Sequence, residues 1–222
     1  MLPRHRAARL TWCRRYLRFT IQEWANILFT DESRFHLDSC HGRSRIYRRV
    51  GKRYADVSVI LRQLFGGGSL MVWGGITAHS RTPLVVIAGN LTGMRYRDEI
   101  VQPYVIPFIQ AQANNVTFQQ ENARPHVLRV VRDYLTQPNV DLLPCPAVSS
   151  EFSPIEHVWD EMERRLRHLP NRPVTLAEMG PALIRIWNNI PQAFFNNLVR
   201  PMRRRCHACI NANGGHTRYW LC

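Results

Sequence analysis

The sequence predicts a mixed α/β fold, in which one β-sheet is flanked by helices and further helices follow it. Three observations indicate this fold: apolar strand-like runs come first, helical and strand-like runs then alternate, and helical patterns alone fill the end of the chain. A chain of 222 residues is long enough for one sizeable core, because a domain of roughly 150–200 residues buries about 70% of its unfolded surface. We therefore expect one domain, with a residual basic helical linker over residues 1–25, a core over 26–170 and a C-terminal helical extension over 171–222.

The N-terminal segment, residues 3–24, is predicted to be helical because apolar side chains and arginines are interleaved along it. Its basic face is either solvated or turned towards a polyanionic partner. The next run, residues 26–35 with the sequence NILFTDESRF, is rich in branched and aromatic side chains. It predicts a buried strand that ends at Asp31.

Further strands and helices follow from the same patterns. Strands are predicted over residues 43–49, 69–77, 84–88, 116–120 and 140–143, with a loop or hairpin insertion over 51–68. Helices are predicted over residues 96–113, 124–136, 154–169, 175–190 and 191–212. Pro103 and Pro107 are expected to kink or split the first of these helices.

The charge of the chain favours a polyanionic partner. Thirty basic residues stand against 16 acidic ones, the net charge is +14, and Lys52 is the only lysine. The guanidinium group of arginine has a rigid forked shape that matches phosphate, so a nucleic acid is the first hypothesis. A basic surface that is merely solvated is the alternative, and composition does not distinguish DNA from RNA.

The cysteines and the N-terminus bear on the compartment. Six cysteines are spread through the chain, the first ten residues are basic, and no apolar run approaches the ~18 residues of a membrane span. We therefore expect reduced thiols and a soluble, intracellular protein without a membrane partner. Cys206-His207-Ala208-Cys209 offers zinc ligands, but it lies in a helical pattern without a second cysteine pair.

Three acidic residues are candidates for a metal site, and each also has a local explanation. Glu156 completes a capping box with Ser153 ahead of a helix, with Pro154 at the first helical position. Glu121 follows a strand and precedes a helix, whose dipole favours an acid there. Asp31 fits a turn or cap. Each acid alone leaves both interpretations open.

Five motifs occur in order along the chain: FTDESRF, FGGGSLMVWGGI, FQQENARPH, PIEHVWDEMERR and GGHTRYW. Together they resemble the catalytic domain of transposases of the mariner superfamily, especially its nematode-type branch, from about Pro3 to Tyr219. That family carries an Asp, Asp, Glu triad on an RNase H-like fold. As in the family pattern, 34 residues separate Glu121 from Glu156, and 89 separate Asp31 from Glu121.

The resemblance implies a metal-dependent enzyme of DNA transposition. Asp31, Glu121 and Glu156 would be the catalytic residues and the ligands of two Mg²⁺ or Mn²⁺ ions in phosphodiester hydrolysis and strand transfer. The implied partner is double-stranded DNA, both transposon ends and a TA target, within the nucleus, and a homodimer is compatible with this function. Candidate DNA contacts are Arg34, Asn122, Arg124, His126, Arg164, Arg203 and Arg204.

Three departures from the family pattern favour a different hypothesis. Glu121 stands where the family has Asp, and its extra methylene adds roughly 1.5 Å beside an ion that demands near-ideal geometry. The family's SPDLNPIE is SSEFSPIE here, over residues 149–156. We also expect the paired-like DNA-binding region of the family to be missing. The alternative is a catalytically impaired, transposon-derived DNA-binding remnant, and a weaker one is a nonspecific nuclease.

Overall fold

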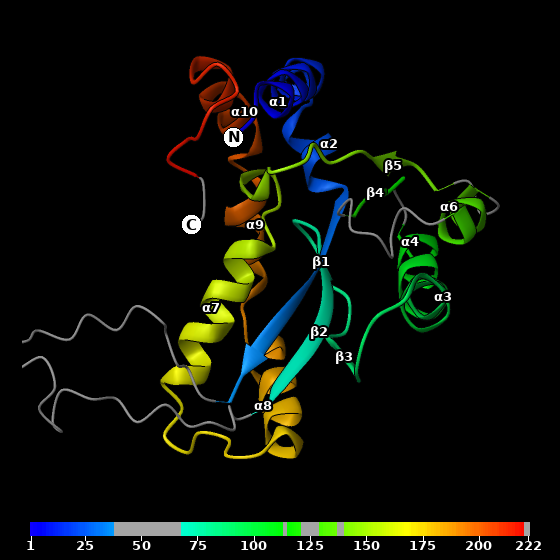
Figure 1. The fold of residues 1–222 in the computed structure, drawn as a ribbon, viewed down its shortest axis with the longest axis vertical. Coiled ribbons are helices and arrows are strands. Elements are labelled where there is room, and N and C mark those ends of the chain that lie inside the picture. Colours follow the sequence, from blue (N-terminus) through cyan, green and yellow to red (C-terminus); the bar gives the residue numbers. More distant parts are fainter. Residues whose placement is uncertain (38–67, 113–114, 121–128, 137–139, 220–222) are drawn as a thin grey trace, which may run out of the picture.

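A mixed sheet of five strands lies at the centre of the molecule in the computed structural model, which describes residues 1–37, 68–112, 115–120, 129–136 and 140–219. The strands are β1 (Ile27–His36), β2 (Ser69–Ile76), β3 (Val85–Ile87), β4 (Thr117–Gln119) and β5 (Leu142–Leu143), in the order β3-β2-β1-β4-β5 (Figure 1). β2 is antiparallel to β1 and β3, whereas β1, β4 and β5 are parallel. The predicted mixed sheet is confirmed. The strand predicted over 43–49 lies outside the described residues, as does nearly all of the loop predicted over 51–68.

Helices cover both faces of the sheet (Figure 1). One face packs against α1 (Pro3–Tyr16), α2 (Ile21–Ala25), η3 (Ser150–Phe152), α7 (Glu156–Arg167), α8 (Leu176–Asn188), α9 (Gln192–Val199) and α10 (Met202–Asn211). The other face packs against α3 (Gly93–Arg95), η2 (Tyr96–Val105), α4 (Ile106–Gln110) and α6 (Arg129–Thr136). The predicted helical C-terminal part of the chain is confirmed.

Two helices that the sequence pattern joins are divided in the structure. The predicted helix over 3–24 ends at Tyr16, and α2 begins after Thr20, whose hydroxyl accepts a hydrogen bond from the Glu23 amide (3.2 Å) in a capping box. The predicted helix over 191–212 is broken before α10, where Pro201 occupies the N-cap. Proline has no N–H to continue the ladder of the preceding helix, which explains this second break.

The helix predicted over 96–113 runs from Gly93 to Gln110 without a gap, so Pro103 and Pro107 do not split it. Residues Tyr96–Val105 form a π-helix that contains Pro103, and the α-helix that follows has Pro107 in its first turn. Proline clashes with the carbonyl four residues earlier, and a wider turn relieves that clash. This segment packs its apolar residues against β1 and β2.

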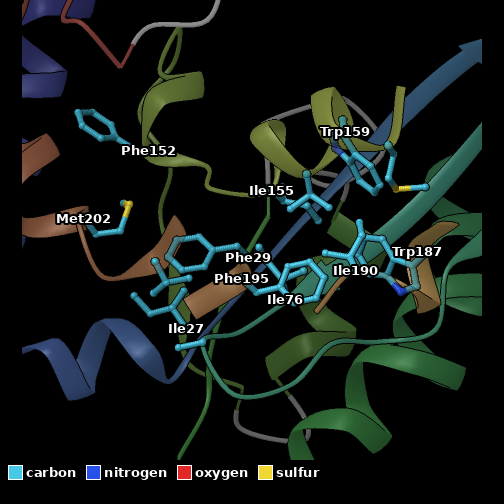
Figure 2. Packing of buried hydrophobic residues seen from close by; sticks show 14 of the residues in the cluster. Ile27, Phe29, Ile76, Phe152, Ile155, Trp159, Trp187, Ile190, Phe195 and Met202 are labelled. Atoms are coloured by element: carbon cyan, nitrogen blue, oxygen red, sulfur yellow. The ribbon is translucent and has the colours of Figure 1, made fainter. Parts of the chain in front are cut away.

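Side-chain alternation along β1 divides the interior into two cores. Ile27 and Phe29 face the larger core, where Figure 2 shows them with Ile155 of the turn before α7 and Phe195 of α9. Leu28 faces the smaller core beneath η2 and α6. Each fully buried aliphatic or aromatic side chain contributes about 1.5–3 kcal/mol, so β1 is anchored from both sides.

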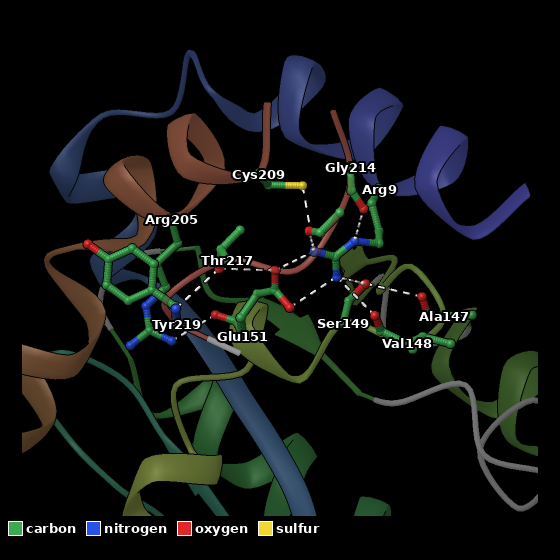
Figure 3. A network of polar contacts seen from close by, with 11 residues as sticks. Arg9, Ala147, Val148, Ser149, Glu151, Arg205, Cys209, Gly214, Thr217 and Tyr219 are labelled. Atoms are coloured by element: carbon green, nitrogen blue, oxygen red, sulfur yellow. Dashed lines mark hydrogen bonds and ion pairs between the residues drawn. The ribbon is translucent and has the colours of Figure 1, made fainter. Parts of the chain in front are cut away.

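A buried ion pair joins the start of the chain to the segment before α7 (Figure 3). Both Nη atoms of Arg9 bind the Glu151 carboxylate, and both side chains are fully buried. Arg205 of α10 donates to the Glu151 carbonyl at 2.7 Å. Burial, the largest single influence, lowers the pKa of Arg9, but the hydrogen bond to Glu151 and the negative charge of Glu151 together outweigh it. The pKa is therefore raised above the usual value and the guanidinium stays charged.

Arg9 also donates hydrogen bonds to backbone carbonyls of the segment before α7 and of the turn after α10. Nη1 donates to the Val148 carbonyl at 2.9 Å, while Nε and Nη2 donate to the carbonyls of Gly214 and Gly215 at 2.9 and 3.0 Å. One guanidinium therefore holds together α1, the segment before α7 and the turn after α10. Glu151, its partner, belongs to the stretch 149–156 that departs from the family pattern.

We expect Glu151→Gln to lower the free energy of unfolding by about 3–5 kcal/mol, because it leaves the Arg9 charge buried without a counter-ion. Urea denaturation followed by tryptophan fluorescence measures this loss. Glu99→Gln is the matched control, since it breaks the more exposed pair of Glu99 with Arg95 and should hardly move the midpoint. Equal shifts from the two variants would contradict the prediction.

Candidate active site

Asp31 lies in the middle of β1, so the prediction that the strand ends at this residue is wrong. β2 pairs with β1 from Phe29 to His36 and prolongs it beyond the acid. The parallel pairing with β4, in contrast, stops at Phe29 and Gln119. Asp31 therefore lies two residues past the point where the parallel part of the sheet ends, and it is only 6% exposed.

Gly74 is the residue of β2 directly opposite Asp31. A Cβ at Gly74 would lie 2.9 Å from the ring of Trp187 and 3.2 Å from that of Trp159, closer than such contacts normally are. The two indoles stack with centroids 5.7 Å apart. Glycine at this position lets α7 and α8 bring both rings down onto the sheet beside the acid.

Trp159 of α7 holds the Asp31 carboxylate in place. Its Nε1 donates to Asp31 Oδ2 at 2.9 Å, and both groups are buried. A hydrogen bond of this kind restricts the orientation of the carboxylate. Trp159 fits the apolar stripe of its helix, which is why the sequence pattern marks it as a core residue only. Trp159 follows Glu156 by three residues, a spacing that puts both side chains on the same face of a helix. That spacing could have indicated a role for Trp159 beside the candidate acid.

Glu156 is the first residue of α7 and is half-buried. The predicted capping box with Ser153 is wrong: Ser153 Oγ is buried and has no hydrogen-bond partner, and Ile155, already helical in conformation, is the N-cap. The chain enters α7 from η3, with the Ser153 amide bonded to the Ser150 carbonyl (2.9 Å), so the turn begins before Ser153 can cap it. Glu156 thus lies one helical turn before Trp159, which binds Asp31.

A hydrogen-bonded pair lies on the opposite face of the sheet. The Tyr96 hydroxyl donates to Gln120 Oε1 at 3.1 Å, and Gln120 directly precedes Glu121. Burial, together with the negative charges of Glu32 and Asp31, raises the pKa of Tyr96 well above its usual value. The phenol therefore stays protonated as a donor and tethers the end of β4. No sequence motif marks this contact.

Several predicted site residues lie outside the described residues, namely Glu121, Asn122, Arg124 and His126. Of the three predicted catalytic acids, the structure describes Asp31 and Glu156, and Trp159, three residues after Glu156 on α7, binds Asp31. Within the described part of the chain, no group of three His, Cys, Asp or Glu residues could hold a metal ion. This finding covers Cys206 and Cys209, which are both buried in α10. None of the described helices is long and apolar enough to cross a membrane.

The remaining candidate DNA contacts do not gather at one place. Arg34 is exposed on β1 and donates to Ser69 Oγ at 3.1 Å. Arg164 is paired with Glu161 of its own helix at 2.8 Å. Arg203 and Arg204 are exposed on α10, which packs beside α1. The last two therefore belong to a different part of the molecule from Arg164.

Comparisons with known proteins agree with this geometry. The model of the DDE superfamily endonuclease family matches residues 26–175. The transposable element Tc1 transposase of Caenorhabditis elegans is 36% identical over 217 residues, which cover 97% of this chain and 78% of that protein. The Tcb1 transposase of Caenorhabditis briggsae is 35% identical over 219 residues, with the same coverage.

Solved structures show the same fold. The Mos1 transposase paired-end complex with left transposon end has a TM-score of 0.78 at 19% identity, covering 98% of this chain and 65% of that chain. The crystal structure of the catalytic domain of Mos1 mariner transposase has a TM-score of 0.73 at 17% identity, covering 98% of both chains. This chain thus spans slightly less than two thirds of the chain in the paired-end complex. The RNase H-like fold is confirmed, and the chain belongs to the DDE superfamily of endonucleases, among the transposases of the Tc1/mariner superfamily.

Proposed function

We propose that this chain cleaves and joins DNA phosphodiester bonds with Asp31, Glu121 and Glu156 as its catalytic residues. The observation that carries the proposal is the bond from Trp159 to Asp31, because it brings the acid of β1 to the first turn of α7, where Glu156 lies. The two acids are 125 positions apart in the sequence, and Trp159, three residues after Glu156 on α7, binds the first of them.

The strand register supports the inclusion of Glu121. Ile27 pairs with Thr117 and Phe29 with Gln119, so the parallel pairing has a constant offset of 90 positions. Asp31 and Glu121 share that offset, each two residues beyond the last pair. Facing residues of parallel strands point to the same side of a sheet. An extension of the register would therefore bring Glu121 level with Asp31, on the face that α7 covers.

The donor set fits Mg²⁺ or Mn²⁺, because all three side chains are carboxylates and these ions prefer oxygen ligands. The buried Asp31 carboxylate is oriented by Trp159, which suits a ligand that must keep its direction. Two bound ions would supply activation of the attacking hydroxyl and stabilisation of the leaving oxygen. Mos1 catalytic-domain structures with Mn and with Mg support this choice of ions.

The proposed substrate is double-stranded DNA. Mos1 transposase was solved in complex with a transposon end and as a strand transfer complex. By similarity, we infer that this chain acts on the ends of a DNA element and on TA target sites in the nucleus, with two copies bound in one complex. Glu121 in place of the family's Asp favours the second candidate, a DNA-binding remnant with impaired chemistry.

We expect the protein to nick supercoiled DNA in Mg²⁺ or Mn²⁺ and Asp31→Asn to reduce nicking to background. Asn keeps the shape of the side chain and an acceptor for Trp159 but lacks the charge that binds a cation. Glu32→Gln is the control, because it removes the neighbouring acid, which points to the other face of β1, and should leave nicking intact. Nicking that persists in Asp31→Asn would rule out the assigned catalytic role.

Glu121→Asp is expected to raise the nicking rate if the extra methylene displaces the carboxylate, since a misplacement of about 1 Å can cost ~100-fold in rate. The rate is compared with that of the unchanged protein at saturating metal, and circular dichroism checks that both are folded. A folded Glu121→Asp variant that is no faster would show that Glu121 is not the defect.

Trp159→Phe should lower metal-dependent nicking by about 10- to 100-fold, the usual effect of losing a side chain that orients a metal ligand. Phenylalanine keeps an aromatic ring in the core, and circular dichroism checks that the variant is folded. Trp187→Phe makes the same change in the stacked neighbour, whose Nε1 donates to the Thr82 carbonyl (2.9 Å) and not to Asp31. This control variant should have a much smaller effect on nicking. Equal losses in the two variants would mean that core packing, and not the hydrogen bond, matters.

A further inference from the structure

The positive charge of the chain is concentrated at its two ends. All 16 acidic residues lie between Glu23 and Glu178. Residues 1–22 contain six arginines and no acid, and residues 179–222 also contain six arginines and no acid. The two ends therefore carry 12 of the 14 net positive charges, while the 156 residues between them are close to neutral.

The fold brings these two acid-free ends together. Figure 1 shows α1 and α10 side by side at one end of the molecule, and the two helices are in contact. Gly214, just after α10, has a φ of +73°, and a Cβ there would lie 2.4 Å from the Arg6 carbonyl oxygen. Such a close approach of two backbones requires glycine. Arg9 adds its hydrogen bonds to Gly214 and Gly215.

Most of the arginines at this end point to solvent. Arg9 and Arg205 are buried against Glu151. The exposed arginines of α1 and the turn after it are Arg4, Arg6, Arg14, Arg15 and Arg18, and those of α10 and the residues just before it are Arg200, Arg203 and Arg204. Among the described residues, none of these eight exposed arginines forms an ion pair with a carboxylate.

The arginines of α7 behave differently. Arg164 and Arg165 both pair with Glu161, and Arg167 pairs with Glu163 on the same helix. On the other face of the sheet, Arg95 pairs with Glu99 in the same way. These helices neutralise much of their own charge, whereas the exposed arginines of α1 and α10 keep theirs.

We propose that the exposed arginines of α1 and α10 form a surface that binds the phosphate backbone of double-stranded DNA, separate from the Asp31–Glu156 site. An α-helix rises 1.5 Å per residue, so α1 is ~21 Å long and can lie along roughly 12 phosphate charges of a duplex. Between Arg4 and Arg15 the exposed side chains are only Arg, Ala and Thr, without the large apolar groups that would insert into a lipid surface. Backbone contacts carry no sequence information, so this surface binds DNA without sequence preference.

This inference rests on the proposed function only in taking DNA as the substrate. The test is fluorescence anisotropy with a random-sequence 30-base-pair duplex in EDTA, from about 50 to 300 mM KCl, so that cleavage plays no part. The variant carries Arg14→Gln, Arg18→Gln, Arg203→Gln and Arg204→Gln in the full chain. Each phosphate contact contributes about 0.9 to the slope of log affinity against log salt concentration, so the slope should become shallower by about 3 to 4.

The matched control also removes four positive charges, but from arginines that form ion pairs: Arg95→Gln, Arg97→Gln, Arg165→Gln and Arg167→Gln. It should keep a slope within about 1 of the unchanged protein. Replacing the four surface arginines by lysine should also preserve the slope, because lysine retains the charge. All variants are compared at equal folded fraction by circular dichroism.

An unchanged salt slope in the four-residue surface variant would overturn the proposal. An equally large decrease of the slope in the ion-paired control would also overturn it, because DNA binding would then depend on net charge alone. Stronger binding to vesicles with 30% phosphatidylserine, or to single-stranded RNA, than to the duplex would also overturn it. Failure of the proposed function gives a different result. The protein would then not nick DNA in Mg²⁺ or Mn²⁺, but the surface variant would still bind DNA with a shallower salt slope than the ion-paired control.

Discussion

The burial of Arg9 and Glu151 is the constraint on which the rest of the structure depends. Neither charge reaches solvent, so each needs the other, and the segments that carry them must meet. Arg9 also donates hydrogen bonds to backbone carbonyls before α7 and after α10. One buried side chain thus joins α1, the segment before α7 and the turn after α10.

The candidate site depends on a second constraint, the absence of a side chain at Gly74. The space opposite Asp31 lets Trp159 and Trp187 stack directly on the sheet, and the Trp159 indole then reaches the acid. On the other face, Tyr96 holds Gln120, the residue before Glu121. In this arrangement Asp31 lies in the middle of β1, whereas exposed arginines that form no ion pair within the described residues lie on α1 and α10.

Much of the fold followed from local pattern. β2, β3, β4, α7 and α8 were predicted within a few residues. Branched and aromatic runs mark the strands, and apolar side chains at helical spacing mark α7 and α8. The errors occurred where another element, in the sheet or next along the chain, overrides the local pattern. β1 is longer than predicted because β2 extends it, and Ser153 does not cap α7 because η3 determines how the chain enters the helix.

The sequence by itself determined the family, through the order and spacing of its motifs, and it determined the total charge and the identities of the three acids. Only the tertiary structure decided that Trp159 binds Asp31, that Glu151 is the buried partner of Arg9, and that Arg164 is neutralised while Arg203 is not. The physical reason is that a motif records which residues are present along the chain. Hydrogen bonds and ion pairs depend on which of them lie within about 3–4 Å of each other after folding.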